Sequence, residues 1–276
     1  MTAHKFSPKA SDPIGVFDSG IGGLTVAKAI GDLLPSEELI YFGDTAHMPY
    51  GEKSPHAIKS YSERIAQFLI EQPCKLIVIA CNSASVTAFK QVQESLPDKN
   101  FVINVIDPVV QYLVEENSYK KIGLIGTKRT VSSAVYKKKF EKAAPEITLK
   151  SLATPLLAPM VEEGFFNNNI SKTVVHSYLS NPHLANIEAI ILACTHYPLI
   201  MKEISSFYGG KVRIVNSAEI VSKAVGSFLE NRNLLNKKKK APKHQFYVSD
   251  FTESFEETAK IFFGGKVRLK EKNLWE

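Results

Sequence analysis

The chain has 276 residues, of which 44% are hydrophobic and 22% are charged, and it contains three cysteines. That length suits one large α/β domain or two of ordinary size, and the composition excludes disordered and fibrous proteins. No run approaches the roughly 18 apolar residues of a membrane helix, and the first thirteen residues lack the apolar segment of a secretory signal. The small, odd number of cysteines predicts a cytoplasmic protein without disulfides. The absence of a C-x-x-C pair predicts no structural zinc site.

The formal net charge is +6, but one local run supplies most of it. Lys237–Lys240 contributes four of these charges and leaves +2 on the rest of the chain. The run lies within Asn231–Lys243, a polar stretch without aromatic residues that we interpret as an exposed connector. The charge therefore predicts no nucleic-acid partner. A non-enzymatic role for the lysine run in binding nucleic acid is kept as a competing hypothesis.

Short apolar runs alternate with amphipathic stretches, a pattern typical of a mostly parallel sheet flanked by helices. One helix start is well marked, because Ser54 suits an N-cap and Pro55 suits the first helical position. In chain order we predict a strand at Ile14–Phe17, a helix at Gly22–Leu34, a strand at Leu39–Phe42, a helix from Pro55, a strand at Leu76–Ala80, a helix at Ser83–Leu96, strands at Val102–Ile106 and Ile122–Ile125, a helix at Val131–Ala144, strands at Ala189–Ala193 and Val212–Val215, a helix at Ser217–Leu229, a strand at Gln245–Val248, a helix at Glu253–Phe263 and a strand at Val267–Leu269.

Two pairs of similar segments indicate an internal repeat. Ile14–Gly20 resembles Ile122–Thr127 at an offset of 108, and Leu76–Asn82 resembles Ala189–Thr195 at an offset of 113. Two pairs at nearly one offset predict a duplicated α/β half of about a hundred residues. We expect two pseudo-symmetric domains with an active site in the cleft between them. The first domain would span 1–105, completed by 217–276, and the second 106–216.

The repeat places two of the three cysteines at equivalent points. Cys81 and Cys194 each follow an apolar strand and precede a polar turn, where open α/β sheets bind ligands. A helix begins after Cys81, so we expect the helix dipole to lower the pKa of that thiol. His196 lies two residues beyond Cys194. Cys74 lacks such a setting and is interpreted as a buried core residue.

Two thiols facing one cleft suit racemisation. That reaction removes a proton from one face of a chiral carbon and returns one to the other face, so two bases on opposite sides need not move. One cysteine must be a thiolate while the other is a thiol, and the roles exchange with the direction of reaction.

The loops after the first two strands carry further candidate residues. Asp18 ends the first strand and is followed by glycines that would allow close approach of a ligand, although a plain tight turn is the alternative. The glycines lack the spacing of a dinucleotide fingerprint. Gly43–Gly51 is either a substrate-contacting loop or a surface turn.

Four short motifs occur in order: Asp18-Ser19-Gly20-x-Gly22-Gly23-Leu24, Pro49-Tyr50-Gly51, Ala80-Cys81-Asn82-x-Ala84-Ser85 and Cys194-Thr195-His196-Tyr197-Pro198. Together they resemble the glutamate racemase family of the aspartate/glutamate racemase superfamily, and the resemblance runs from about Ile14 to near the C-terminus. It implies an enzyme without cofactor or metal that interconverts L- and D-glutamate for peptidoglycan synthesis.

The resemblance also implies roles for individual residues. Cys81 and Cys194 match the two catalytic acid/bases, and Asp18 matches the carboxylate beside the first thiol. His196 matches the imidazole beside the second thiol, and Glu162, preferred over Glu163, matches a carboxylate that assists it. The positions that match substrate contacts are Asp18, Ser19, Pro49, Tyr50, Gly51, Asn82, Ser83, Thr127, Thr195 and His196.

One position departs from the family pattern, because Ser83 stands where the family usually has threonine. The hydroxyl is retained, so we expect little change in recognition of the substrate carboxylate. The family forms homodimers in different arrangements, and we expect a homodimer here, with a monomer as the alternative. Some members bind an activating cell-wall precursor through an N-terminal extension, but His4–Pro13 does not decide whether this chain does.

Two alternative enzyme functions stay open. An aspartate racemase would use the same scaffold and the same thiols. A thiol hydrolase or amidase would use Cys81 as nucleophile and His196 as base, which leaves Cys194 without a role.

Overall fold

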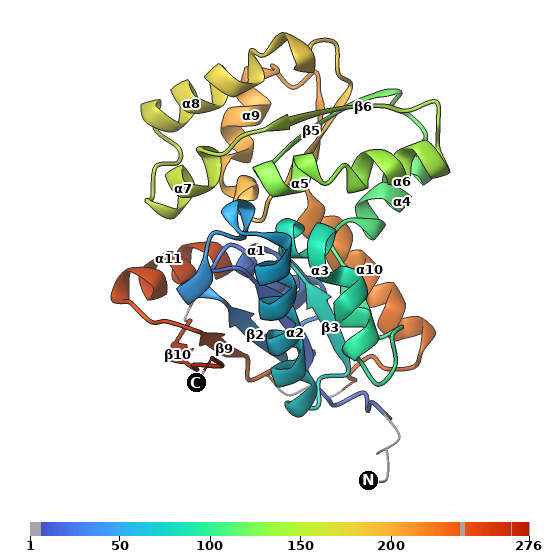
Figure 1. Ribbon diagram of the computed structural model, residues 1–276, viewed down its shortest axis with the longest axis vertical. Helices are drawn as coiled ribbons and strands as arrows, with labels where there is room; N and C mark the ends of the chain where they lie inside the picture. Colours follow the sequence, from blue (N-terminus) through green and yellow to red (C-terminus); the bar gives the residue numbers. More distant parts are fainter. Residues whose placement is uncertain (1–6, 238–240, 266, 276) are drawn as a thin grey trace.

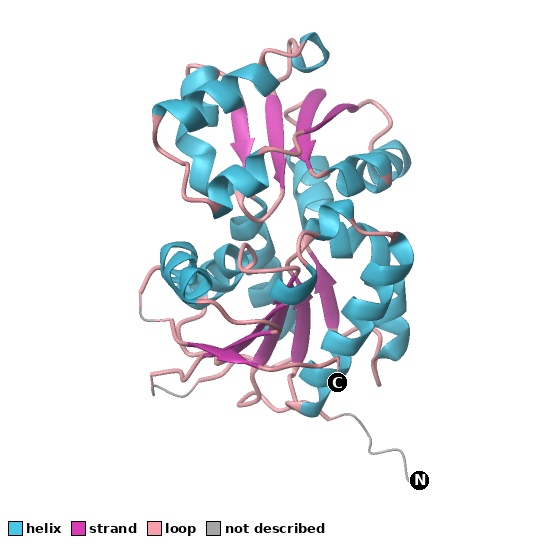
Figure 2. Cartoon of the chain, turned by 60° about the vertical axis from the view of Figure 1, so that its left-hand side comes forward, coloured by secondary structure: helices cyan, strands magenta, loops and turns pink. Residues whose placement is uncertain are grey.

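Two parallel sheets organise the chain, which we describe from a computed structural model at residues 7–237, 241–265 and 267–275 (Figure 1). The predicted α/β class is confirmed, with helices flanking each sheet (Figure 2). Most of the lysine run, Lys238–Lys240, and the first part of the N-terminal segment, 1–6, lie outside the described residues. Lys237 is exposed.

The first sheet has the strand order β10-β9-β2-β1-β3-β4, and every neighbouring pair is parallel. Three of its four inner strands, β2, β1 and β3, are buried at every residue, which is why they read as continuous apolar runs in the sequence. The strands are β1 (Ile14–Asp18), β2 (Leu39–Gly43), β3 (Leu76–Ile79), β4 (Val102–Asn104), β9 (Gln245–Val248) and β10 (Leu269–Glu271).

The second sheet has the order β6-β5-β7-β8, again parallel throughout. This order repeats β2-β1-β3-β4 of the first sheet, so the sequence repeat corresponds to a repeated topology. The strands are β5 (Lys121–Gly126), β6 (Thr148–Ala153), β7 (Ala189–Ala193) and β8 (Arg213–Val215). The division of the chain into folding units at 105 and 216 stays a prediction.

Helices cover both sheets and also connect them. Ser54 caps its helix as predicted, since its side chain accepts a hydrogen bond from the Ala57 N–H at 3.2 Å. The helices are α1 (Leu24–Leu33), α2 (Pro55–Glu71), α3 (Asn82–Ser95), α4 (Asp107–Glu116), α5 (Lys128–Ser132), α6 (Val135–Ala143), α7 (Leu157–Glu162), α8 (Asn169–Leu179), α9 (Met201–Phe207), α10 (Ser217–Asn231) and α11 (Glu253–Phe263). Of these, α4 and α10 carry the chain between the two sheets.

Several predicted elements differ from the structure in their bounds, among them the strand predicted at Val102–Ile106, which ends at Asn104. The single helix expected at Val131–Ala144 is two helices, α5 and α6, because Ala134 adopts a left-handed conformation with φ of 55°. The last strand begins at Leu269 and not at Val267, since Leu269 pairs with Phe246 of β9. The prediction also missed β6, α4, α7, α8 and α9.

Candidate active site

The carboxyl ends of the two sheets enclose a cavity of about 30 Å³, roughly the room of one water molecule. Side chains from both halves of the chain contribute to its wall. It is lined by Ser19, Pro49, Tyr50, Gly51, Cys81, Asn82, Ser83, Thr127, Ala158, Glu162, Cys194, Thr195 and His196. Every predicted site residue is in that set except Asp18, which is buried beside it. Ala158 was missed, because an alanine in a short helix carries no chemical signal.

Cys81 follows β3 and forms the N-cap of α3. Its sulfur accepts a hydrogen bond from the Ala84 N–H at 3.4 Å and donates to Ser19 Oγ at 3.6 Å. Burial raises the pKa of the Cys81 thiol, and the nearby Asp18 carboxylate raises it further. The expectation of a lowered pKa is therefore wrong. The helix N-terminus does favour the thiolate, but desolvation of the sulfur outweighs it.

Asp18 ends β1 and joins the two halves of the cavity. Its Oδ2 accepts hydrogen bonds from the Gly23 N–H at 2.6 Å and from the Thr195 hydroxyl at 3.4 Å, while Oδ1 is buried with no partner among the described residues. Burial raises the pKa of Asp18, and the nearby His196 and backbone N–H groups only partly oppose this. Asp18 is thus a carboxyl group that is costly to ionise.

The glycines after Asp18 are required by close approach. A Cβ on Gly22 would lie 2.5 Å from Cε1 of His196 and 2.7 Å from Oγ1 of Thr195. This turn packs directly against the loop that follows β7, and its approach to a ligand stays a prediction.

Cys194, His196 and Glu162 form a row on the other side of the cavity. The Cys194 sulfur lies 3.5 Å from Nδ1 of His196, and Nε2 of His196 lies 2.8 Å from Oε1 of Glu162. Burial lowers the pKa of His196, but contacts with Cys194 and Glu162 outweigh it and raise the pKa well above its usual value. Both ring nitrogens face acceptors, which favours the imidazolium. Glu163 is exposed and lines a separate pocket.

Neutral donors make up most of the remaining wall. The Ser83 hydroxyl lies 2.9 Å from that of Thr127, which in turn lies 3.0 Å from the hydroxyl of Thr130. The Ser83 hydroxyl, which the family's threonine would also provide, thus forms a hydrogen bond with Thr127. No lysine or arginine is among the residues that line the cavity, so an anionic ligand would be held by N–H and O–H groups.

A buried carboxylate that the sequence prediction overlooked anchors the loop after β2. Asp44 accepts hydrogen bonds from the Tyr50 hydroxyl at 2.6 Å and from the Ser249 hydroxyl at 2.8 Å, and it lies 2.8 Å from Nδ1 of His47. The Tyr50 hydroxyl is therefore engaged with Asp44, which is not among the residues that line the cavity. Polar residues clustered in Gly43–Gly51 were the available signal for this network.

Cys74 lies away from the cavity and packs in the core of the first sheet against α2, as predicted. Its sulfur lies where a side chain on Gly15 of β1 would be. Burial raises the pKa of Cys74 to about 12. This thiol is a structural group.

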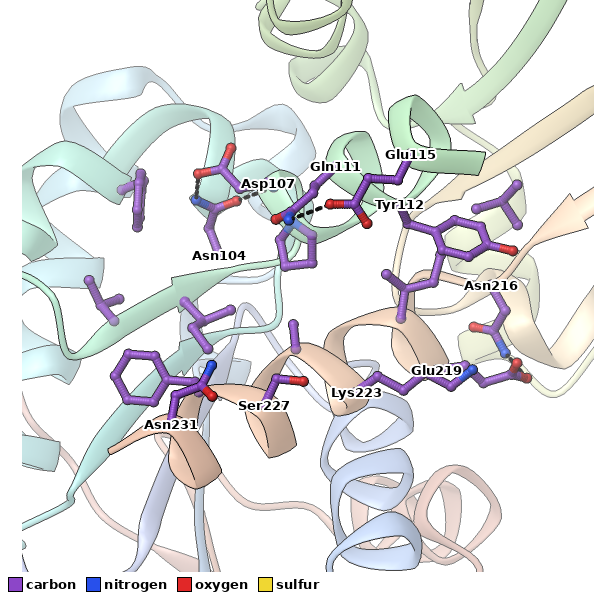
Figure 3. Close-up of a pocket in the computed structure, with 18 of the residues that line it drawn as sticks. Asn104, Asp107, Gln111, Tyr112, Glu115, Asn216, Glu219, Lys223, Ser227 and Asn231 are labelled. Atoms are coloured by element: carbon purple, nitrogen blue, oxygen red, sulfur yellow. Dashed lines mark hydrogen bonds between the residues drawn. The ribbon is translucent and has the colours of Figure 1, made fainter. Parts of the chain in front are cut away.

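A larger pocket of about 530 Å³ lies between α4 and α10 (Figure 3). Several of its polar side chains are paired with one another, as in the hydrogen bonds from Asn104 to Asp107 at 2.8 Å and from Asn216 to Glu219 at 2.9 Å. None of the three thiols lines this pocket, so the acid/base chemistry belongs to the smaller cavity.

Two further searches cover the described residues only. Within residues 7–237, 241–265 and 267–275, no group of three or more His, Cys, Asp or Glu side chains is arranged to hold a metal ion. No helix in that part of the chain is long and apolar enough to cross a membrane.

Comparison with known proteins shows full-length similarity to racemases. The Asp/Glu/Hydantoin racemase family matches residues 24–225. Glutamate racemase from Geobacter metallireducens is 39% identical over 254 residues, which cover 92% of this chain and 93% of the relative.

Solved structures agree. The crystal structure of glutamate racemase from Francisella tularensis in complex with D-glutamate is 38% identical, with a TM-score of 0.89 over 96% of this chain and 99% of that one. Escherichia coli glutamate racemase, solved with L-glutamate and the activator UDP-MurNAc-Ala, is 25% identical, with a TM-score of 0.73 over 91% and 93%.

Proposed function

This chain belongs to the Asp/Glu/Hydantoin racemase family, and on that premise we propose that it interconverts L- and D-glutamate by moving the Cα proton between two cysteines. One observation carries the proposal: Cys81 follows a strand of one sheet, Cys194 follows the equivalent strand of the other, and both thiols line one cavity. Similarity to the glutamate racemases over nearly the whole chain supports glutamate as the substrate.

The proton balance needs no other reactant. In one direction the Cys194 thiolate takes the Cα proton from one face of the substrate, and the Cys81 thiol gives its proton to the opposite face. The turnover ends with Cys194 as a thiol and Cys81 as a thiolate, and the reverse reaction starts from that state. Each cysteine acts once as base and once as acid.

The surroundings of the two sulfurs differ. The Cys194 sulfur lies 3.5 Å from Nδ1 of His196, whose Nε2 lies 2.8 Å from Glu162. Cys81 lies in a desolvated position beside the Asp18 carboxyl group, which raises the pKa of its thiol. The two faces of the substrate would therefore meet cysteines in unlike environments.

The decisive experiment is chiral analysis of glutamate after incubation with the purified protein alone. In D₂O, L-glutamate should acquire deuterium at Cα as the D form accumulates, and removal of pyridoxal phosphate should change nothing. Cys81→Ala and Cys194→Ala should each abolish racemisation. Cys74→Ala is the matched control and should stay active, because Cys74 lies outside the cavity. Full activity in either of the first two variants would overturn the two-base assignment.

The alternatives make different predictions. An aspartate racemase would turn over aspartate faster than glutamate when both are assayed side by side. A thiol hydrolase would accumulate an acyl-enzyme on Cys81 in a burst assay and would not need Cys194. The glutamate racemases named above favour neither alternative.

The cellular role is part of the proposal. A cytoplasmic racemase of this kind would supply D-glutamate for peptidoglycan. All three cysteines of the structure are free thiols, which suits a reducing compartment. Depletion of the protein should stop growth, and external D-glutamate should restore it.

Assembly and regulation stay predictions. We expect a homodimer, which light scattering on the purified protein would distinguish from a monomer. The E. coli relative is named with an activating cell-wall precursor, and titrating UDP-MurNAc-Ala into the racemisation assay would test the same activation here.

A further inference from the structure

A buried hydrogen bond joins the two halves of the molecule at the edge of the cavity. The hydroxyl of Tyr136, on α6, donates to Oδ1 of Asn82, the first residue of α3, at 2.9 Å. Both residues are almost completely buried, at 2% and 4% exposure. Asn82 lines the cavity and Tyr136 does not, so Tyr136 acts on the cavity only through Asn82.

Binding of a substrate in this cavity depends on which atom of the Asn82 amide faces it. A glutamate substrate carries two carboxylates, yet the lining contains no lysine or arginine. The imidazole of His196 also lines the cavity, but its two nitrogens face Cys194 and Glu162, so neutral donors supply the other contacts to the negative charge. An asparagine can present either its NH₂ group, which attracts a carboxylate, or its oxygen, which repels one.

Tyr136 removes that ambiguity. The Tyr136 hydroxyl donates its hydrogen bond to Oδ1 of Asn82, while Nδ2 of Asn82 has no hydrogen-bond partner among the described residues. We propose that Tyr136 is a positioning residue that fixes the Asn82 amide with its NH₂ group facing the cavity, where it donates to a substrate carboxylate. The inference rests on the proposed racemase function and adds a residue outside the recognised motifs.

Tyr136 is suited to this task because it stays a donor. Burial, and then the charge of Asp107, raise its pKa far above the ordinary tyrosine value, so the hydroxyl keeps its proton across the working pH range. After the break between α5 and α6 at Ala134, Tyr136 lies in the first turn of α6 and belongs to the hydrophobic core.

The test is a steady-state comparison with L-glutamate. Tyr136→Phe deletes one oxygen and frees the amide to turn, so we expect KM to rise about tenfold or more with kcat within about threefold. Tyr208→Phe is the matched control: its hydroxyl is buried in the same half with no partner among the described residues, and KM should not change. Asn82→Asp keeps the acceptor for Tyr136 but presents an oxygen to the substrate, so it should raise KM more than Asn82→Ala.

A double-mutant cycle separates positioning from general stability. Tyr136→Phe in an Asn82→Ala background should cause no further rise in KM, because the amide is already gone. An unchanged KM in folded Tyr136→Phe, or additive effects in the cycle, would overturn the inference. Should Tyr136→Phe not fold, Asn82→Asp still decides, because a KM no higher than that of Asn82→Ala also overturns it. Loss of racemisation by the wild-type chain would instead contradict the proposed function.

Discussion

Nε2 of His196 lies 2.8 Å from Oε1 of Glu162, so the imidazole beside the second thiol is held by a carboxylate from helix α7. The two residues are 34 positions apart, and only the fold brings them together. Together with the contact to Cys194, this contact raises the pKa of His196 well above its usual value.

Replacing Glu162 by Gln should shift the pH dependence of the reaction. The carboxylate helps to raise the pKa of His196, so its removal lets the imidazolium lose its proton at lower pH. The alkaline limb of kcat/KM should move toward lower pH, with about tenfold lower activity at pH 8. Glu163→Gln is the control and should leave the profile unchanged, because Glu163 is exposed. An unchanged limb in the Glu162 variant would contradict the role of this ion pair.

Replacing glycine by alanine should lower the activity at one position and raise the stability of the protein at another. At Gly22 the new methyl would press on His196 and Thr195, and we expect kcat/KM to fall about 100-fold. At Gly226, within α10, the nearest atom would be 3.6 Å away, so alanine should stabilise the protein by about 0.5–1 kcal/mol. Racemisation assays and urea midpoints measure the two effects. Full activity of Gly22→Ala would show that this close approach is not needed.

The three thiols should react with iodoacetamide at different rates. Cys194 lies beside a cationic imidazole and should be alkylated first, whereas burial raises the pKa of Cys74 to about 12 and leaves almost no thiolate at pH 8. Peptide mass spectrometry over time gives the order, and D-glutamate should protect Cys194 but not change Cys74. Labelling of Cys74 before Cys194 in the folded protein would contradict these environments.

Removing one charge from the buried ion pair of Lys75 and Glu37 should lower the free energy of unfolding more than removing a charge from an exposed pair. Lys75 Nζ lies 2.5 Å from Oε2 of Glu37, and both side chains are almost fully buried. Lys75→Met leaves an unpaired buried carboxylate and should lower the free energy of unfolding by about 3–5 kcal/mol. Adding Glu37→Gln should recover part of this loss. The exposed pair of Lys28 and Asp32 is the control, and Lys28→Met should cost less than about 1 kcal/mol in the same denaturation assay.

The sequence alone determined the class of fold and which residues are candidates for the chemistry. Buried parallel strands need apolar side chains on both faces, so β1, β3, β5 and β7 stand out as continuous apolar runs. Cys81 and Cys194 follow two of these runs, and the repeat showed that their positions are equivalent. Elements with weaker patterns were missed. β6 is an edge strand without a fully buried residue, and α7 and α9 have six and seven residues.

Only the tertiary structure decided what surrounds the thiols. The pairing of Glu162 with His196, the bond from Tyr136 to Asn82 and the anchoring of Tyr50 by Asp44 all join residues from different elements. Local propensity carries no information about such contacts. The pKa of Cys81 was mispredicted for the same reason: the helix start is visible in the sequence, whereas the burial and the Asp18 charge that outweigh it arise when two sheets close on one cavity.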